Sequence, residues 1–150
     1  MINVTVDNSY KAIEDLYIAG LFEDNFKEAD PRASFEDFEV NLESSFHLLD
    51  AGMLGIVVAK DEDELVGYLI YTIVPKDLFT KSTVASTICV YVKPEYRGGT
   101  AFKRILDCAE NSAKERGAKV LHVGLTPNSV NLERFGYHTD NVVYSKRLEV

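Results

Sequence analysis

The hydrophobic pattern of this chain changes its period partway along, and that change constrains the fold more than any other feature. In the first part, apolar residues recur at helical spacing over residues 10–21 and 38–49. In the second part, apolar and β-branched runs of strand length occupy residues 54–60, 65–74 and 82–92. A short charged turn joins the first two runs, which predicts an antiparallel hairpin. The chain therefore requires both helices and a sheet.

Other local signals complete the order of the elements. A variant of the capping box at Ser34-Phe35-Glu36-Asp37 predicts that the second helix begins there. The remaining expected elements are a strand at 2–6, a helix at 101–117, a strand at 120–124, a short helix from Thr126-Pro127 to Gly136, and a last strand at 142–148. This order, βααβββαβαβ, predicts one α/β domain over residues 1–150 with a mixed sheet.

Composition excludes several classes of protein. With 150 residues, of which 46% are hydrophobic, the chain can bury a core and is not a disordered protein. No apolar run approaches the ~20 residues that span a bilayer, and no basic-then-apolar leader opens the chain. Cys89 and Cys108 lack the spacing of metal ligands or of a disulfide framework. We therefore expect a cytoplasmic protein without a metal or a membrane partner.

The charge is divided unevenly along the chain. Residues 1–65 carry 16 acidic and 4 basic side chains, a balance of −12, and residues 66–150 carry 8 and 12, a balance of +4. The net charge of −8 argues against a nucleic-acid partner, since such binding relies on a basic surface. The basic half could hold a small polyanion. The alternative is that the acidic residues only solvate two helices.

One segment carries a recognisable chemistry. In VYVKPEYRGGTA, residues 90–101, a strand passes through two glycines into the start of an amphipathic helix. The first turn of a helix has amides without internal partners at the positive end of the dipole, which suits a phosphate. Arg97, Lys103 and Arg104 add positive charge. The alternative is a plain connection with glycines for turn geometry; no Gly-Lys-Ser/Thr follows, so it is not a P-loop.

These residues resemble the Gcn5-related N-acetyltransferases (GNAT). The resemblance rests on VYVKPEYRGG, on the helix that ends at Arg116-Gly117, and on Phe135-Gly136-Tyr137 and Tyr144-Ser145-Lys146. The RGG spelling and the small size are similar to phage-encoded members. The resemblance implies a single-domain fold with a mostly antiparallel mixed sheet and about four helices. It also implies acetyl-CoA as cosubstrate, an amine acceptor that attacks the thioester directly in a ternary complex, and a homodimer as one assembly.

The resemblance also assigns roles to residues. The amides of residues 98–102 would hold the pyrophosphate, the strand at 90–92 would pair with the pantetheine arm, and an N–H around Tyr91 or Val92 would polarise the thioester carbonyl. The implied cofactor contacts are Val90, Tyr91, Val92, Arg97, Gly98, Gly99, Thr100, Ala101, Phe102, Lys103 and Asn128.

The sequence departs from the family pattern at two points. The family's loop glycines fall at Thr100 and Phe102 when counted from Arg97, so the second glycine has moved to Gly99. The tyrosine that often protonates the thiolate falls at Leu132 or Phe135, depending on the alignment.

The departures leave the general acid and base unassigned. Tyr137 and Tyr144 are nearby tyrosines, although packing with a satisfied hydroxyl explains either one. Residues 82–92 contain no carboxylate to serve as base, and His47 on the second helix is the remaining candidate, with a helix histidine in an ordinary hydrogen bond as the alternative.

Three functional hypotheses follow. The first is an N-acetyltransferase that acts on a cationic amine, with a basic cofactor half and an acidic acceptor half. The second is a catalytically silent protein of the same fold that binds CoA or a protein. The third is an acidic interaction protein for a basic partner, against which the basic second half argues.

Overall fold

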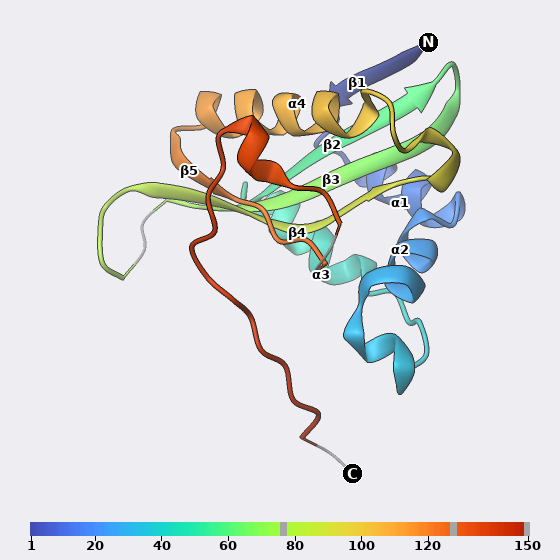
Figure 1. Cartoon of the computed structure of the whole chain (residues 1–150), viewed down its shortest axis with the longest axis horizontal. Helices are drawn as coiled ribbons and strands as arrows, with labels where there is room; N and C mark the ends of the chain where they lie inside the picture. Colours follow the sequence, from blue (N-terminus) through green and yellow to red (C-terminus); the bar gives the residue numbers. More distant parts are fainter. Residues whose placement is uncertain (76–77, 127–128, 149–150) are drawn as a thin grey trace.

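The computed structural model describes residues 1–75, 78–126 and 129–148. In this part of the chain, five strands form one sheet in the order β1-β2-β3-β4-β5 (Figure 1). The strands are β1 (Ile2–Val6), β2 (Leu54–Asp61), β3 (Glu64–Val74), β4 (Thr83–Val92) and β5 (Ala118–His122). The first four pair antiparallel, and β4 pairs with β5 in parallel. The sheet is therefore mixed and mostly antiparallel, as predicted.

Helices cover both faces of the sheet. They are α1 (Tyr10–Ile18), α2 (Leu21–Ala29), α3 (Leu42–Asp50) and α4 (Ala101–Glu115). Figure 1 shows α4 alone along one face and the other three helices on the opposite face. Short 3₁₀ turns are Pro31–Ser34, Pro94–Tyr96 and Leu132–Phe135. No helix in the described residues is both long enough and apolar enough to span a membrane.

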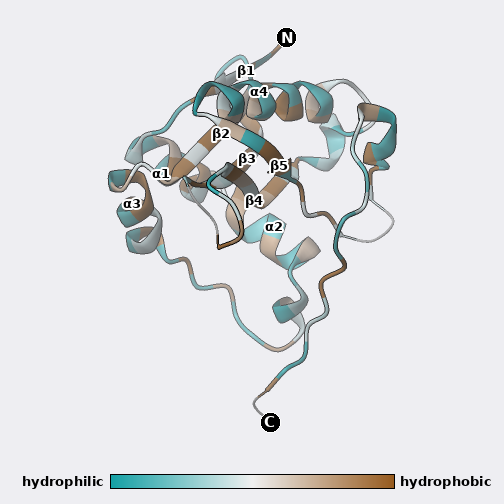
Figure 2. Cartoon of the chain, turned by 90° about the vertical axis from the view of Figure 1, so that its left-hand side faces the viewer, coloured by the Kyte–Doolittle hydropathy of each residue, from teal (hydrophilic) through white to brown (hydrophobic). Residues whose placement is uncertain are grey.

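Two apolar clusters hold these layers together. Ile105, Leu106 and Ala109 of α4 are fully buried against one face of the sheet, which confirms the helical spacing read from the sequence. Ile13 and Leu16 of α1 are buried against the other face. In Figure 2 the hydrophobic colours gather on the central strands, while the surrounding helices carry both hydrophilic and hydrophobic stretches.

Two buried tyrosines of β3 fasten α2 and α4 to the sheet through hydrogen bonds. The Asn25 amide on α2 donates to the Tyr68 hydroxyl at 2.7 Å. On the other face, the hydroxyls of Tyr71 and Ser112 on α4 share a hydrogen bond of 2.6 Å. Because each buried hydroxyl has a partner, the two helices are held in register with the sheet at little desolvation cost.

The N-terminal helices differ from the prediction. The helix expected over residues 10–21 ends at Ile18, because Gly20 adopts a left-handed φ of 82° and lets the chain turn into α2. The second predicted start, Ser34, ends a 3₁₀ turn instead. The helix begins at Leu42, where the Asn41 side chain accepts from the Ser44 amide at 3.1 Å and so supplies the better cap.

The C-terminal predictions were wrong in more than their boundaries. Residues 142–148, predicted as a strand, form no regular structure, and Val143 and Tyr144 are 87% and 90% exposed. Alternating residues form a strand only where a neighbouring strand accepts their backbone bonds, and none lies beside this segment in the described part of the chain. The helix predicted from Thr126-Pro127 is a 3₁₀ turn over Leu132–Phe135, and Pro127 lies outside the described residues.

Candidate functional site

The strands β4 and β5 separate halfway along β4. Their pairing runs from Thr83 opposite Ala118 to Ser86 opposite His122 and then stops. Beyond this pairing, one hydrogen bond of 3.0 Å, from the Gly124 amide after β5 to the Thr87 hydroxyl, still joins the two segments. The register against β3 slips at this point, which leaves Ile88 as a bulged residue. Beyond it, no strand among the described residues lies beside residues 88–92 on the side away from β3, and we call this stretch the open β4 edge.

The register shows which backbone groups face the open β4 edge. The Lys93 amide donates to the Val66 carbonyl of β3 at 2.8 Å, and backbone groups alternate in direction along an antiparallel strand. The N–H of Tyr91 therefore points toward β3, while those of Val90 and Val92 point outward. The Arg97 Nε donates to the Val92 carbonyl at 2.7 Å, which agrees with this assignment.

The side chains of residues 89–92 alternate between the two clusters, whereas Ile88, which the same alternation placed with Val90 and Val92, is 56% exposed at the bulge. Val90 and Val92 lie in the cluster beneath α4, and Cys89 and Tyr91 lie in the opposite one. Burial raises the pKa of the Cys89 thiol to about 12, so the thiol keeps its proton at neutral pH and is a poor nucleophile. Burial also raises the pKa of Tyr91, with further contributions from Asp24 and Glu28 of α2.

The connection from β4 to α4 leaves amide donors without partners among the described residues. The first helical bond runs from the Arg104 amide to the Thr100 carbonyl at 3.0 Å, so the amides of residues 101–103 have no acceptor within the helix. The Thr100 side chain caps none of them. A Cβ placed at Gly98 or Gly99 would meet no atom within 4 Å. The start of α4 therefore offers several donors beside open space.

The cationic side chains predicted for this loop are engaged elsewhere. The Arg97 guanidinium lies 2.8 Å from one carboxylate oxygen of Glu28 and 2.9 Å from the other, and it stands over the ring of Tyr91. Lys103 is paired with Asp107 one turn further along α4 and lies over the ring of Phe135. Arg97 and Lys103 are close to the loop, but each already has a carboxylate partner, and the third predicted cation, Arg104, donates to the Ile2 carbonyl of β1.

The loop is also fastened to the turn between β2 and β3. The Tyr96 hydroxyl donates to Asp61 at 2.9 Å, and this carboxylate raises the pKa of Tyr96 to about 12. Lys93 pairs with Glu64 at 2.9 Å. The backbone that leads into the two glycines is thus held by the ends of β2 and β3, which is how binding loops are usually positioned.

The three candidate catalytic side chains do not share a site. The Tyr137 hydroxyl donates to Glu110 of α4 at 2.7 Å, and burial together with this carboxylate raises the pKa of Tyr137. Tyr144 is exposed on the C-terminal segment, and the His47 side chain on α3 is 72% exposed at 3.9 Å from Glu43. Asn128, a predicted cofactor contact, lies outside the described residues.

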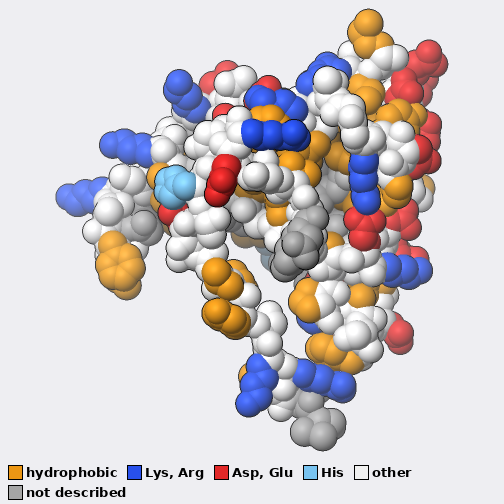
Figure 3. Space-filling view, viewed as in Figure 1, with side chains coloured by type: hydrophobic (Ala, Val, Ile, Leu, Met, Phe, Trp, Pro, Cys, Tyr) orange, Lys and Arg blue, Asp and Glu red, His pale blue; other side chains and the backbone are white. Residues whose placement is uncertain are grey.

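Sequence reasoning missed the contribution of α2. Asp24 and Glu28 both act on Tyr91, and Glu28 holds Arg97, so this helix delivers acidic groups to the side of β4 opposite α4. The apolar positions Leu21, Phe22 and Phe26 carried the signal, but the turn at Gly20 hides the start of the helix. Figure 3 shows acidic side chains along the right-hand edge of the molecule, where the turn between β2 and β3 lies at the top and α1 and α2 lie below it.

Comparison with known proteins places this arrangement among acetyltransferases. The model of a family described as the acetyltransferase (GNAT) family matches residues 12–137. An aminoglycoside acetyltransferase from an uncultured soil metagenomic sample, solved with sisomicin, has a TM-score of 0.72 at 14% identity, with 99% of this chain and 97% of that chain covered.

Two further solved structures are similar. A ribosomal-protein-alanine N-acetyltransferase from Brucella melitensis biovar Abortus 2308 has a TM-score of 0.68 at 19% identity, covering 99% of this chain and all of the other, 100%. A predicted acetyltransferase from Clostridium acetobutylicum, solved with acetyl-CoA, has a TM-score of 0.73 at 15% identity, covering 99% of this chain and 97% of that chain. At these identities the likeness shows a shared fold. A search of curated proteins finds no match.

Proposed function

The chain belongs to the acetyltransferase (GNAT) family, and from that premise we propose that it transfers the acetyl group of acetyl-CoA to an amine by direct attack within a ternary complex. The observation that carries this proposal is that the open β4 edge runs directly into the loop and the free amides at the start of α4. The open β4 edge offers outward amides, and the same strand leads through two glycines to the unpartnered amides of α4.

The start of α4 suits the pyrophosphate of acetyl-CoA. The amides of residues 101–103 lie at the positive end of a 15-residue helix, and a Cβ at Gly98 or Gly99 would have no described atom beyond the neighbouring residues within 4 Å. A diphosphate needs several donors at close range, and glycines allow that approach. We therefore propose that residues 98–103, with Thr100 as an added hydroxyl donor, hold the phosphates.

The open β4 edge suits the pantetheine arm and the thioester. Extended amide-containing ligands bind sheet edges as an added strand, and the outward groups of Val90 and Val92 are the ones that such a ligand reaches. Of the two residues that the resemblance suggested for polarising the carbonyl, Tyr91 directs its N–H toward β3, whereas Val92 directs its N–H outward. We propose that the outward amides of β4 stabilise the oxyanion of the attacked thioester.

The proton transfers are proposed to use water. An amine with a pKa of about 10.4 has to lose a proton before it attacks, and β4 contains neither a carboxylate nor a histidine. The hydroxyl of Tyr137 is directed to Glu110, so we do not assign this tyrosine as the acid for the departing thiolate. This arrangement also supports the second candidate, a family member that binds acetyl-CoA without turnover.

We propose a cationic amine as the acceptor. The side of Tyr91 away from α4 faces Asp24 and Glu28, and the charge balance of −12 in residues 1–65 places most acidic groups in the segment that contains these helices. A positively charged acceptor is attracted to such a surface and is repelled from the basic half. One similar structure holds an aminoglycoside, sisomicin.

Two measurements on the purified protein test the proposal. Calorimetry with acetyl-CoA is expected to give a dissociation constant of about 1–50 μM, which corresponds to about −6 to −8 kcal/mol. Thiol release is then followed with a panel of polyamines, aminoglycosides and peptides. Absence of binding would reject the enzyme and the silent member together. Binding without thiol release from any amine would favour the silent member.

The ion pair between Arg97 and Glu28 gives a second prediction. Both side chains are about half exposed, and a pair of this kind is worth less than about 1 kcal/mol. Replacing Glu28→Gln frees the guanidinium for a phosphate, so we expect acetyl-CoA to bind about two- to fivefold more tightly. Glu14→Gln on α1 removes the same charge and serves as control. Equal effects in both variants, or weaker binding in Glu28→Gln, would contradict a phosphate role for Arg97.

A further inference from the structure

The strand β1 forms the edge of the sheet opposite β5, and no described element pairs with its outer side. The Asp7 amide donates to the Ile56 carbonyl of β2 at 2.9 Å, so backbone groups of odd-numbered residues face β2. The groups of Ile2, Val4 and Val6 therefore face outward. Arg104 of α4 donates to the Ile2 carbonyl, and the outward groups of the two valines have no partner among the described residues.

This edge has few of the features that normally protect an edge strand. Native sheets avoid pairing with other chains through lysines, prolines or bulges on their edges. The sequence INVTV contains no charge and no proline, and its register with β2 is uninterrupted. Val6 is 42% exposed. An uncharged, regular edge with an exposed valine is suited to receive another strand.

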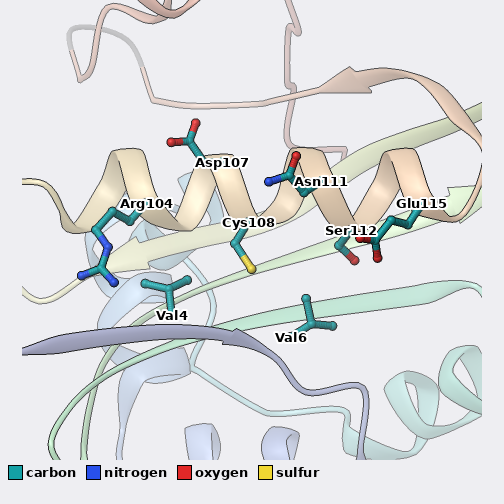
Figure 4. Close-up of a pocket in the computed structure, with 8 residues that line it drawn as sticks. All are labelled: Val4, Val6, Arg104, Asp107, Cys108, Asn111, Ser112 and Glu115. Carbon is teal, nitrogen blue, oxygen red and sulfur yellow. The ribbon is translucent and has the colours of Figure 1, made fainter.

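A groove runs between β1 and α4 beside this edge. Its volume is about 450 Å³. Figure 4 shows Val4 and Val6 projecting from β1 toward the helix, Cys108 pointing back toward the strand, and Arg104 and Glu115 at opposite ends of the row. The β1 side of the groove is therefore apolar, α4 adds the polar residues Asp107, Asn111 and Ser112, and opposite charges stand at the two ends.

We propose that this edge is a homodimer interface, in which β1 of a second copy adds antiparallel to β1 across a two-fold axis at Val4. The strand has five residues, Ile2–Val6, with Val4 at its centre. In that register Val4 pairs with its own counterpart, and the Ile2 carbonyl accepts from Val6 of the partner subunit in place of Arg104, which releases the guanidinium. The outward N–H and C=O groups of β1 in one copy thus face the same groups of β1 in the other copy. A two-fold contact requires such a match, because both copies use the same surface.

The charges at the ends of the groove favour a second copy over other occupants. The two-fold axis brings Arg104 of one copy to the end of the groove that holds Glu115 of the partner subunit. Glu115 is the last residue of α4, where the helix dipole disfavours an acid, and it has no ion-pair partner among the described residues. An arginine from the partner subunit would supply the missing charge at both ends.

The proposed dimer leaves the acetyl-CoA site accessible. The sheet order puts β1 and the open β4 edge on opposite sides of β2 and β3. The two copies would form one continuous sheet with both β4 edges outermost. The inference therefore does not rest on the proposed function, and its failure would leave that function unaffected.

Sedimentation velocity tests the interface. We expect wild-type protein to show a concentration-dependent shift from monomer to dimer between about 10 and about 500 μM, since the contact is short. Val4→Pro removes an outward N–H but no bond of the β1–β2 ladder, and it should weaken association at least about tenfold. A wild-type monomer throughout this range, or a Val4→Pro variant that dimerises normally, would overturn the proposal.

Exchanging the charges of Arg104 and Glu115 gives an independent test, because a folding defect would not restore dimerisation in the double variant. Glu115→Arg places two arginines together in the dimer and should abolish it, although a cation at the end of α4 favours the monomer's helix. The double variant Arg104→Glu with Glu115→Arg restores opposite charges and should recover association. Dimerisation of the single variant, or failure of the double variant to recover while its circular dichroism is unchanged, would exclude this interface.

Discussion

Replacing Gly99 with leucine is expected to weaken acetyl-CoA binding by about 100-fold while the protein remains folded. Gly99 does not adopt a positive φ, and a side chain there meets no protein atom within 4 Å, so leucine is tolerated by the unliganded chain. Because Gly99 lies two residues before α4, we expect the bulky side chain to obstruct a diphosphate bound at the amides of residues 101–103. Loss of two charge-assisted hydrogen bonds corresponds to about 3 kcal/mol, hence the factor of about 100. Calorimetry and thermal unfolding measure the two effects separately.

Gly98 and Gly117 provide a matched control for this loop. Their φ values are 87° and 90°, and a Cβ at either position would have no atom within 4 Å, so alanine strains both backbones alike. Each variant should lose about 1 kcal/mol of stability. Only Gly98→Ala should also lose acetyl-CoA affinity, because Gly117 lies at the far end of α4. Equal affinities in the two variants, together with normal binding by Gly99→Leu, would remove the phosphate-binding role of the loop.

The loop and the central sheet were predictable because each rests on local patterns. The apolar positions of α4 recur at one helical spacing, and the alternation of Val90 and Val92 against Tyr91 sets the two faces of β4. Residues 142–148 carry an equally regular alternation but form no strand. Alternation describes which faces a strand would have, and it contains no information about a neighbouring strand.

The rest of the site depends on contacts between distant segments. Arg97 was predicted to add charge at the loop, and it does lie there, but the carboxylate that holds it comes from α2, a helix hidden in the sequence by the turn at Gly20. The direction of the Val90 amide also follows only from the pairing with β3 and from the bulge at Ile88. A shift of one residue in that register would have turned the opposite amides outward.

Val90→Pro should reduce kcat/KM for acetyl transfer by about 100- to 1,000-fold, the usual cost of losing an oxyanion-hole donor, because the outward amide of Val90 is one of the β4 amides proposed to stabilise the oxyanion. This N–H makes no bond to β3, so proline removes no hydrogen bond of the sheet, although its fixed φ costs some stability. The rate of thiol release, measured at varied acetyl-CoA and saturating amine, gives kcat/KM for acetyl-CoA. Circular dichroism verifies the fold.

Two companion variants separate the lost amide from other effects of Val90→Pro. Val90→Ala shortens the side chain but keeps the N–H, and it should retain activity within about threefold, since the residue is only partly buried. Val4→Pro introduces proline at an outward amide of the opposite edge strand, and it should cost similar stability without slowing turnover. A Val90→Pro enzyme with near-normal kcat/KM would show that the outward amide at Val90 takes no part in catalysis. Equal losses in Val90→Pro and Val90→Ala would assign the effect to the side chain instead, and catalysis would then rest on Val92 or on water.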